Sequence, residues 1–131
     1  MADHLQGAAL GLFEEQQVVD QAHALRCAVR VATMRPDRED LIQAALLHDV
    51  GKRHSRLGVM ARVVASLLVR MRLPVTTRMQ AYLDHGRLGA IELADLGLPE
   101  VVAAFAGHDS DRPPPGVHPD DWALLLAADL E

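Results

Sequence analysis

The apolar residues of this chain recur at the three- and four-residue spacing of amphipathic helices over almost its whole length. A first helix is predicted over residues 13–34, where apolar side chains form a single stripe and a proline follows two residues later. A second helix is predicted to start near Asp37, a good N-cap residue, and to end near Gly51. A third, over residues 57–71, has the pattern of a plain core helix.

The second half of the chain predicts shorter helices separated by breaks. A segment from Thr76 is interrupted at the HGRLG stretch around His85, and a further helix begins at Pro99, a residue tolerated in a first turn. The proline-rich loop DSDRPPPGVHP separates it from a terminal helix in which Trp122 and Asp129 share a face. Strands have little support because only 3% of the residues are aromatic and no β-branched alternation is sustained. The pattern therefore predicts an all-α domain.

Length and charge narrow the class of protein. A chain of 131 residues that is 50% hydrophobic is long enough for one domain and short for two, so residues 1–131 are expected to form a single domain. The net charge of -5 argues against stable nucleic-acid binding, which needs clustered Lys and Arg. The single cysteine, Cys27, excludes an intrachain disulfide and fits a cytoplasmic location. With no apolar run long enough for a signal peptide or a membrane span, no membrane contact is expected.

Several ionisable residues lie at or beside the predicted helix ends, within apolar segments. Taken singly, such a histidine is more often hydrogen-bonded to a backbone carbonyl than bound to a metal. An aspartate near the end of a helix, such as Asp129, can simply belong to a frayed last turn. Burying several of them in one small core costs free energy unless they pair or bind an ion, so a shared metal is the economical explanation. These residues are His23, His48, Asp49, His85, His108 and Asp129.

The order of these residues, H…HD…H…H…D, resembles that of the HD-domain superfamily of metal-dependent phosphohydrolases. The segment ALLHDVGK is similar to the central signature of that family, and HGRLGAIELADLGLP to the region around its third histidine. The closing LLLAADLE is similar to its last helix, so the likeness spans nearly the whole chain. It implies a compact helical bundle with a metal site in its core.

The residue types suit a divalent cation independently of this resemblance. Imidazole and carboxylate groups without sulfur bind Fe, Mn, Zn, Co, Ni or Mg, and the pattern does not distinguish among them. Adjacent helical side chains project about 100° apart, so His48 and Asp49 can meet one ion only where the helix end loosens, which is where Gly51 places them. Asp49 is also suited to bridge two ions, which about 3.5 to 4 Å apart would activate a water and hold a phosphate together.

The resemblance implies one or two metal ions and assigns their ligands. A second ion would share Asp49 with the first and would also be held by His85 and His108. The implied ligands of the first ion are His23, His48, Asp49 and Asp129.

The resemblance also implies hydrolysis of a small phosphorylated substrate, such as a nucleotide or another phosphoester. Lys52, the single lysine of the chain, would bind a phosphate oxygen or assist the leaving group, and Arg53 would contact the phosphate. The alternatives are a solvated lysine in the last turn of a helix, where a cation is favoured, and a surface arginine.

The chain departs from the family pattern at two places. Many members with two metals carry a His-His pair where this chain has His108-Asp109, so Asp109 would replace a ligand, orient His108 or take no part. Members that act on cyclic dinucleotides carry a Gly-Tyr-Pro motif after the HD segment, and GKRHSRLGV has none. That substrate class is therefore disfavoured.

Two other functions share the same ligand set or the same fold. An HD-fold di-iron oxygenase would use the same six ligands, and a regulatory HD domain would bind partners without catalysis. Lys52 favours phosphate chemistry, because the corresponding residue of the oxygenases is often histidine. The presence of all six ligands argues against a regulatory domain that has lost its site.

Overall fold

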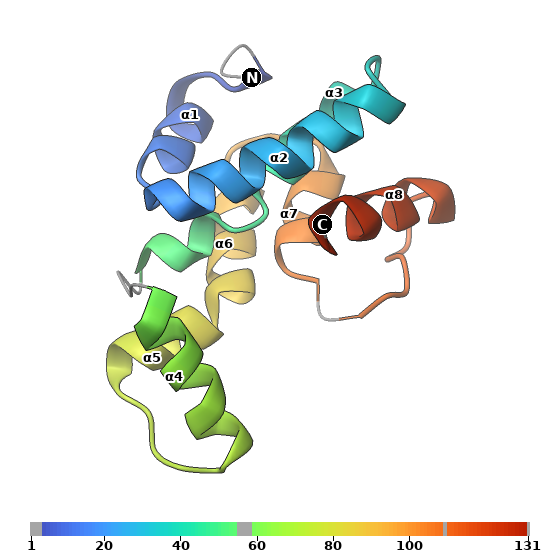
Figure 1. Cartoon of the computed structure of the whole chain (residues 1–131). Helices are drawn as coiled ribbons and strands as arrows, with labels where there is room; N and C mark the ends of the chain where they lie inside the picture. Colours follow the sequence, from blue (N-terminus) through green and yellow to red (C-terminus); the bar gives the residue numbers. More distant parts are fainter. Residues whose placement is uncertain (1–3, 55–58, 109, 131) are drawn as a thin grey trace.

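The structure is a computed structural model that describes residues 4–54, 59–108 and 110–130. Within these ranges every regular element is a helix, which confirms the all-α prediction for the described part of the chain (Figure 1). None of the described helices combines the length and the apolar character needed to cross a membrane. The elements are α1 (Gly7–Glu14), α2 (Val18–Met34), α3 (Glu39–Leu47), the 3-10 helix η2 (Val50–His54), α4 (Val59–Arg70), α5 (Thr77–Leu83), α6 (His85–Ala94), α7 (Glu100–Ala106) and α8 (Pro119–Leu130).

The core lies around α3, which packs against α2, α7, α8 and α1. The run IQAALL of this helix is apolar almost all round, the pattern of a helix enclosed by others, and Leu41, Leu46 and Leu47 are buried. On the α7 and α8 side, Phe105 and Trp122 meet edge to face with ring centroids 5.5 Å apart. The core therefore fixes the position of the end of α3. His48 and Asp49, which we call the HD pair, follow directly after it.

The first predicted helix, over residues 13–34, begins too early: α2 covers Val18–Met34, and the first two predicted residues belong to the end of a separate helix, α1, that was not predicted. α1 ends at Glu14 and α2 begins at Val18, and the polar EEQQ run between them turns the chain so that α1 covers α3. The side-chain amide of Gln21 donates to the carbonyls of Glu14 and Gln16, at 3.1 and 2.9 Å, which satisfies backbone groups at the end of α1. The periodicity missed this break because no proline or glycine marks it.

The second predicted helix is also shorter than expected. α3 ends at Leu47, and the chain then tightens into the 3-10 helix η2, which carries Gly51 and Lys52. A break near His85 is confirmed, but it lies at Asp84, between the end of α5 at Leu83 and the start of α6 at His85, and the HGRLG stretch itself forms the first half of α6.

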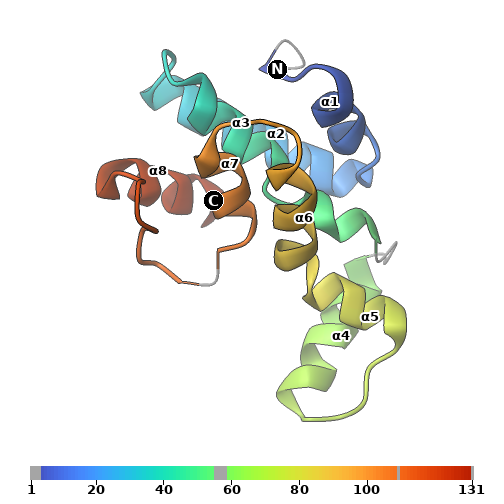
Figure 2. The same ribbon diagram turned by 180° about the vertical axis from the view of Figure 1, so that it is seen from behind.

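The prediction of a plain core helix over residues 57–71 is wrong for residues 59–71, and residues 57 and 58 lie outside the described residues. α4 and α5 form a hairpin that projects away from the other helices (Figure 1 and Figure 2), and much of the apolar surface of α4 is exposed. α4 is attached through its opposite face, where Ala65 is buried and the guanidinium of Arg62 donates to both carboxylate oxygens of Asp20 in α2. A helix can show a strong apolar stripe in sequence and still turn it outward when a buried ion pair decides which face packs.

Gly51 is required for close packing of η2 against α6. Its φ is not positive, so a left-handed backbone conformation is not the reason for a glycine here. A Cβ atom at Gly51 would lie 1.8 Å from the carbonyl oxygen of His85 and 2.8 Å from the backbone nitrogen of Gly89. These two backbone segments approach so closely only because residue 51 has no side chain, and this contact sets His85 beside the HD pair.

Candidate metal centre

The HD pair lies directly after α3, at the junction with η2. His48 is the C-cap residue of α3, with φ -64° and ψ -25°, and Asp49 follows it in the turn before η2. The side chains are 3% and 8% exposed, because the apolar turns of α3 and the surrounding helices enclose them. The spacing argument placed both residues past the regular part of the helix, and the structure has them there. Two adjacent side chains can therefore face the same point.

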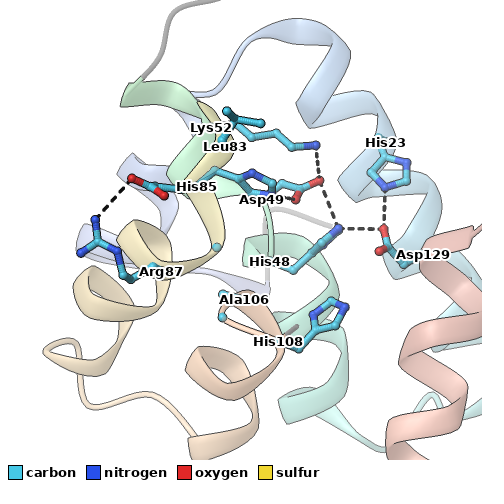
Figure 3. Close-up of a pocket in the computed structure, with 13 residues that line it drawn as sticks. His23, His48, Asp49, Lys52, Leu83, His85, Arg87, Ala106, His108 and Asp129 are labelled. Carbon is cyan, nitrogen blue, oxygen red and sulfur yellow. Dashed lines mark hydrogen bonds and ion pairs between the residues drawn. The ribbon is translucent and has the colours of Figure 1, made fainter. Parts of the chain in front are cut away.

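His23 and Asp129 reach this point from two other helices. His23 comes from the middle of α2, and Asp129 from the last turn of α8, which lies beside α2 (Figure 3). One nitrogen or oxygen atom from each of His23, His48, Asp49 and Asp129 lies within 4.8 Å of all the others. A group with this composition and spacing could hold a metal ion. The four residues predicted for the first ion thus lie together, although they are 106 positions apart at the extremes.

Asp129 is the common neighbour of the two histidines. Its Oδ1 atom lies 2.8 Å from Nε2 of His23 and 2.9 Å from Nε2 of His48. Nε2 of His48 is also 3.2 Å from Oδ2 of Asp49. Both histidines therefore present the same nitrogen, Nε2, to the carboxylates.

A backbone contact orients the ring of His48. Its Nδ1 atom donates to the carbonyl oxygen of Ala45 at 2.7 Å, which leaves Nε2 to face the carboxylates. In a neutral ring of this tautomer, Nε2 carries a lone pair, and a lone pair opposite carboxylate oxygens is repulsive unless a proton or a cation lies between them. Burial opposes a charge on His48, but the hydrogen bonds with Asp129 and Asp49 outweigh it and raise its pKa to about 10. The position between these atoms is therefore one that a positive charge favours, as a metal site requires.

The two carboxyl groups are held in their ionised form. Burial raises the pKa of Asp49, but its contacts with His48 and His85 and the charge of Lys52 more than offset this and hold the pKa far below its usual range. For Asp129 burial is likewise outweighed by His48 and His23, and the pKa falls to about 2. Metal ligands must be deprotonated, and both carboxylates meet that condition.

Cys27 lies one turn after His23 on α2 and is buried. Burial, together with the negative charges of Asp129 and Asp49, raises the pKa of its thiol to about 12. The group of four whose ligand atoms lie together does not include Cys27, so the donor set of this candidate site is nitrogen and oxygen only.

Asp49 faces two sides of the site with its two oxygens. Oδ2 lies 3.0 Å from Nζ of Lys52 and 3.2 Å from Nε2 of His48, whereas Oδ1 lies 3.3 Å from Nε2 of His85 (Figure 3). His85 is the first residue of α6 and lies outside the group of four. A carboxylate with one oxygen toward each of two histidines has the arrangement that a bridging ligand needs.

His108 lines the same cavity, just past the end of α7. Its Nδ1 atom donates to the carbonyl of Phe105, and its ring is stacked on that of Phe105 with centroids 4.7 Å apart and planes 2° apart. These two contacts fix the ring and direct Nε2 away from the backbone. His108 is not within the group of four, so any role as a ligand belongs to a second position.

The site opens into a cavity of about 550 Å³. Lys52 lies in its wall beside Asp49, which places the predicted phosphate-binding group next to the candidate metal ligands. Two charged residues of the rim were missed in the sequence, Asp84 and Arg87, which lie 3.6 Å apart as an ion pair. Their position in the sequence could have identified them, because both lie within two residues of His85, where one helix ends and the next begins. The cavity is lined by His23, His48, Asp49, Lys52, Leu83, Asp84, His85, Gly86, Arg87, Ala106, Gly107, His108 and Asp129.

Arg53 is not brought into this cavity. Its guanidinium donates to Glu15 at 2.9 Å and to Glu92, and also to the carbonyl of Val50 at 3.1 Å. These contacts tie η2 to the end of α1 and to α6, so the structure gives Arg53 an ion-pairing position and no support for the predicted phosphate contact. Asp109, the other uncertain residue, lies outside the described residues.

Searches against protein-family models, curated proteins and solved structures gave no match for this chain. What the site can do is therefore inferred from its own residues. Their chemistry is that of a partly buried nitrogen and oxygen donor set beside a lysine, at the end of a cavity of ligand size.

Proposed function

We propose that this chain is an HD-type metal-dependent phosphohydrolase that acts on a small phosphoester or nucleotide-type substrate. One observation carries the proposal: the ligand atoms of four residues predicted as metal ligands lie within 4.8 Å of one another, with Lys52 3.0 Å from one of them. A metal site alone suits many reactions. A lysine beside it, in the wall of the same cavity, adds a cation that can bind a phosphate oxygen.

His23, His48, Asp49 and Asp129 would hold a divalent cation, and the donor set suits Fe, Mn, Zn, Co, Ni or Mg. His85 and His108, with the Oδ1 side of Asp49, would hold a second. When bound, such ions lower the pKa of a water and neutralise charge on the phosphoryl group. The contacts of Nε2 of His48 support the fit, because its carboxylate neighbours favour a positive charge at that point, and a metal cation could supply it in place of a proton.

Residues of the chain that surround the ions would bind the substrate and keep the site in position. Lys52 donates to Asp49 and would transfer part of that hydrogen bonding to an incoming phosphate oxygen or to the leaving group. The Nδ1 bond of His48 to Ala45 keeps its ring from turning, which preserves the geometry of the site during turnover. Arg87, at the rim, would meet the substrate before it reaches Lys52.

The cavity supports a small substrate. Its volume of about 550 Å³ falls within the range of small-molecule sites, and the net charge of -5 disfavours a nucleic acid. The phosphate end of such a molecule is the part that Lys52 and the ions would recognise.

The test is metal analysis together with a hydrolysis screen. Protein purified without chelator should carry about one to two divalent ions per chain by elemental analysis, as expected for a site of this type. The screen should offer a generic phosphomonoester, a generic phosphodiester and a set of nucleotides, each with the six metals in turn. Phosphate release that depends on metal supports the proposal. Turnover that consumes dioxygen and releases no phosphate would instead indicate an oxygenase.

Replacing Lys52 with alanine should lower kcat/KM roughly 10- to 100-fold, the range for loss of one charged hydrogen bond in a transition state. A rise in KM alone would assign Lys52 to phosphate binding, and an equal fall in kcat would assign it to the leaving group. Metal content should stay unchanged, since Lys52 donates to Asp49 and cannot ligate while protonated.

Arg53→Ala is the matched control for Lys52→Ala. It also removes a cation from η2, but from the side that faces Glu15 and Glu92. Its kinetics should remain close to those of the wild type, with some loss of thermal stability. Wild-type kinetics for Lys52→Ala would remove this residue from the mechanism, and a large kinetic loss for Arg53→Ala would restore the phosphate contact that its position does not support.

A further inference from the structure

The outer face of α4 is apolar and turned to solvent. Met60, Val63, Val64 and Leu67 are spaced so that they share one face of the helix, and their side chains are 76%, 50%, 41% and 50% exposed. We call these four residues the outer face. A contiguous apolar stripe of this kind on a folded protein is the mark of a contact surface.

The apolar surface continues around the tip of the hairpin. Val69, Met71 and Leu73, at and after the end of α4, are 48%, 66% and 47% exposed. Val69 is two positions from Leu67 and so about 200° around the helix, almost opposite the outer face. The tip is therefore apolar on more than one side, and the hairpin projects from the other helices (Figure 1 and Figure 2).

The same region is positively charged to the exclusion of acidic residues. Residues 59–83, from the start of α4 to the end of α5, contain four of the 13 Lys and Arg residues and none of the 18 Asp and Glu residues of a chain whose net charge is -5. Arg62 is buried against Asp20, which α2 supplies, but Arg70 and Arg72 at the tip are exposed. An occupant of this surface must therefore be both apolar and anionic.

Two macromolecular partners fit these observations less well. A second copy of the chain would bring like charges together, and a two-fold contact through the outer face would leave Val69 on the far side exposed. A nucleic acid offers anionic charge but no apolar phase to cover the aliphatic side chains of the stripe. A lipid bilayer with anionic headgroups differs from both partners, because its fluid acyl chains can surround a projecting apolar tip on every side while its headgroups supply negative charge.

We propose that the α4 hairpin docks on an anionic phospholipid membrane. The outer face and the tip enter the boundary between headgroups and acyl chains, while Arg70 and Arg72 remain at the level of the phosphates. A helix of 12 residues is about 18 Å long and cannot cross a hydrocarbon layer of about 30 Å, so it lies in the interface. The proposed contact is peripheral, which agrees with the finding that none of the described helices could cross a membrane.

The experiment is co-sedimentation of the full chain with vesicles. Wild-type protein should bind vesicles of phosphatidylcholine and phosphatidylglycerol in equal parts and bind pure phosphatidylcholine more weakly. Leu67→Glu should weaken binding at least about tenfold, because it puts a charge in place of a buried aliphatic group. Val18→Glu makes the same kind of change at a residue of α2 that is 81% exposed and should bind like the wild type. Circular dichroism of each variant verifies that the helices are retained.

A second pair of variants tests the charge of the surface by replacing arginines at the tip, without changing the apolar residues of the outer face. Arg70→Gln and Arg72→Gln together should weaken binding to the anionic vesicles by about fivefold for each residue and leave binding to neutral vesicles unchanged. No binding of the wild type to anionic vesicles overturns the proposal. So does a wild-type dimer in light scattering that Leu67→Glu dissociates, because the outer face would then be an interface between copies.

Discussion

Asp49→Asn is expected to abolish turnover and to lower metal affinity by more than about 100-fold, the upper range for loss of a single supporting group at a metal site. Asp49 contacts three residues of the cavity, with Oδ2 facing His48 and Lys52 and Oδ1 facing His85. An amide keeps the shape of the carboxylate but removes the negative charge that anchors a cation. Calorimetric titration with Mn²⁺ or Zn²⁺ measures the affinity, and the hydrolysis screen measures the turnover.

Asp84→Asn is the control for Asp49→Asn. Asp84 belongs to the wall of the same cavity but pairs with Arg87 at the rim and lies outside the group of four. The same loss of one charge there should leave metal affinity within a few-fold of the wild type. Equal affinity for metal in Asp49→Asn and wild type, with helical circular dichroism retained in both, would contradict the site.

The second large effect is expected from Gly51→Ala. A methyl group at this position would lie 1.8 Å from the carbonyl oxygen of His85. The methyl carbon is bonded directly to the backbone and the oxygen is a backbone atom, so no side-chain rotation can separate them. Overpacking of this kind costs about 3 kcal/mol or more in the free energy of unfolding. Urea unfolding, followed by circular dichroism, measures the loss. Metal affinity should fall as well, because relief of the clash moves η2, with Lys52 and the adjoining Asp49, away from His85.

Gly11→Ala is the matched control for Gly51→Ala. Gly11 lies inside α1, has no positive φ, and a Cβ atom there would meet nothing within 4 Å. This variant should be more stable by about 0.5 to 1 kcal/mol, because alanine is the better helix former. An unfolding midpoint for Gly51→Ala equal to that of the wild type would contradict the close approach of η2 and α6.

Much of the helical organisation follows from local pattern. The spacing of apolar residues predicted the all-α class, and the prediction of a break near His85 came within one residue of its place at Asp84. The adjacency of His48 and Asp49 at a helix end could also be read directly, since adjacent side chains meet only beyond the regular helix. These features depend on residues a few positions apart, and a sequence displays such relations.

The sequence also ordered the candidate ligands, but their convergence needed the tertiary structure. His23 and Asp129 meet because α8 packs beside α2, and Lys52 lies in the cavity because η2 turns its side chain inward. Arg53, the next residue, is turned outward by one step of the same helix and is bound by Glu15 and Glu92. A difference of one position along a tight helix decides which cation faces the site.

By itself, the sequence determined that the chain forms helices, where several of them break, and which residue types are available to a metal. The tertiary structure decided which face of α4 packs, that Gly51 is needed for close packing, and that Asp49 lies between His48 and His85. Helix formation depends on neighbours three or four residues apart, whereas these outcomes depend on contacts between distant segments. The buried pair of Arg62 with Asp20 shows the reason: one long-range ionic contact, made inside the protein, outweighed the apolar periodicity of α4.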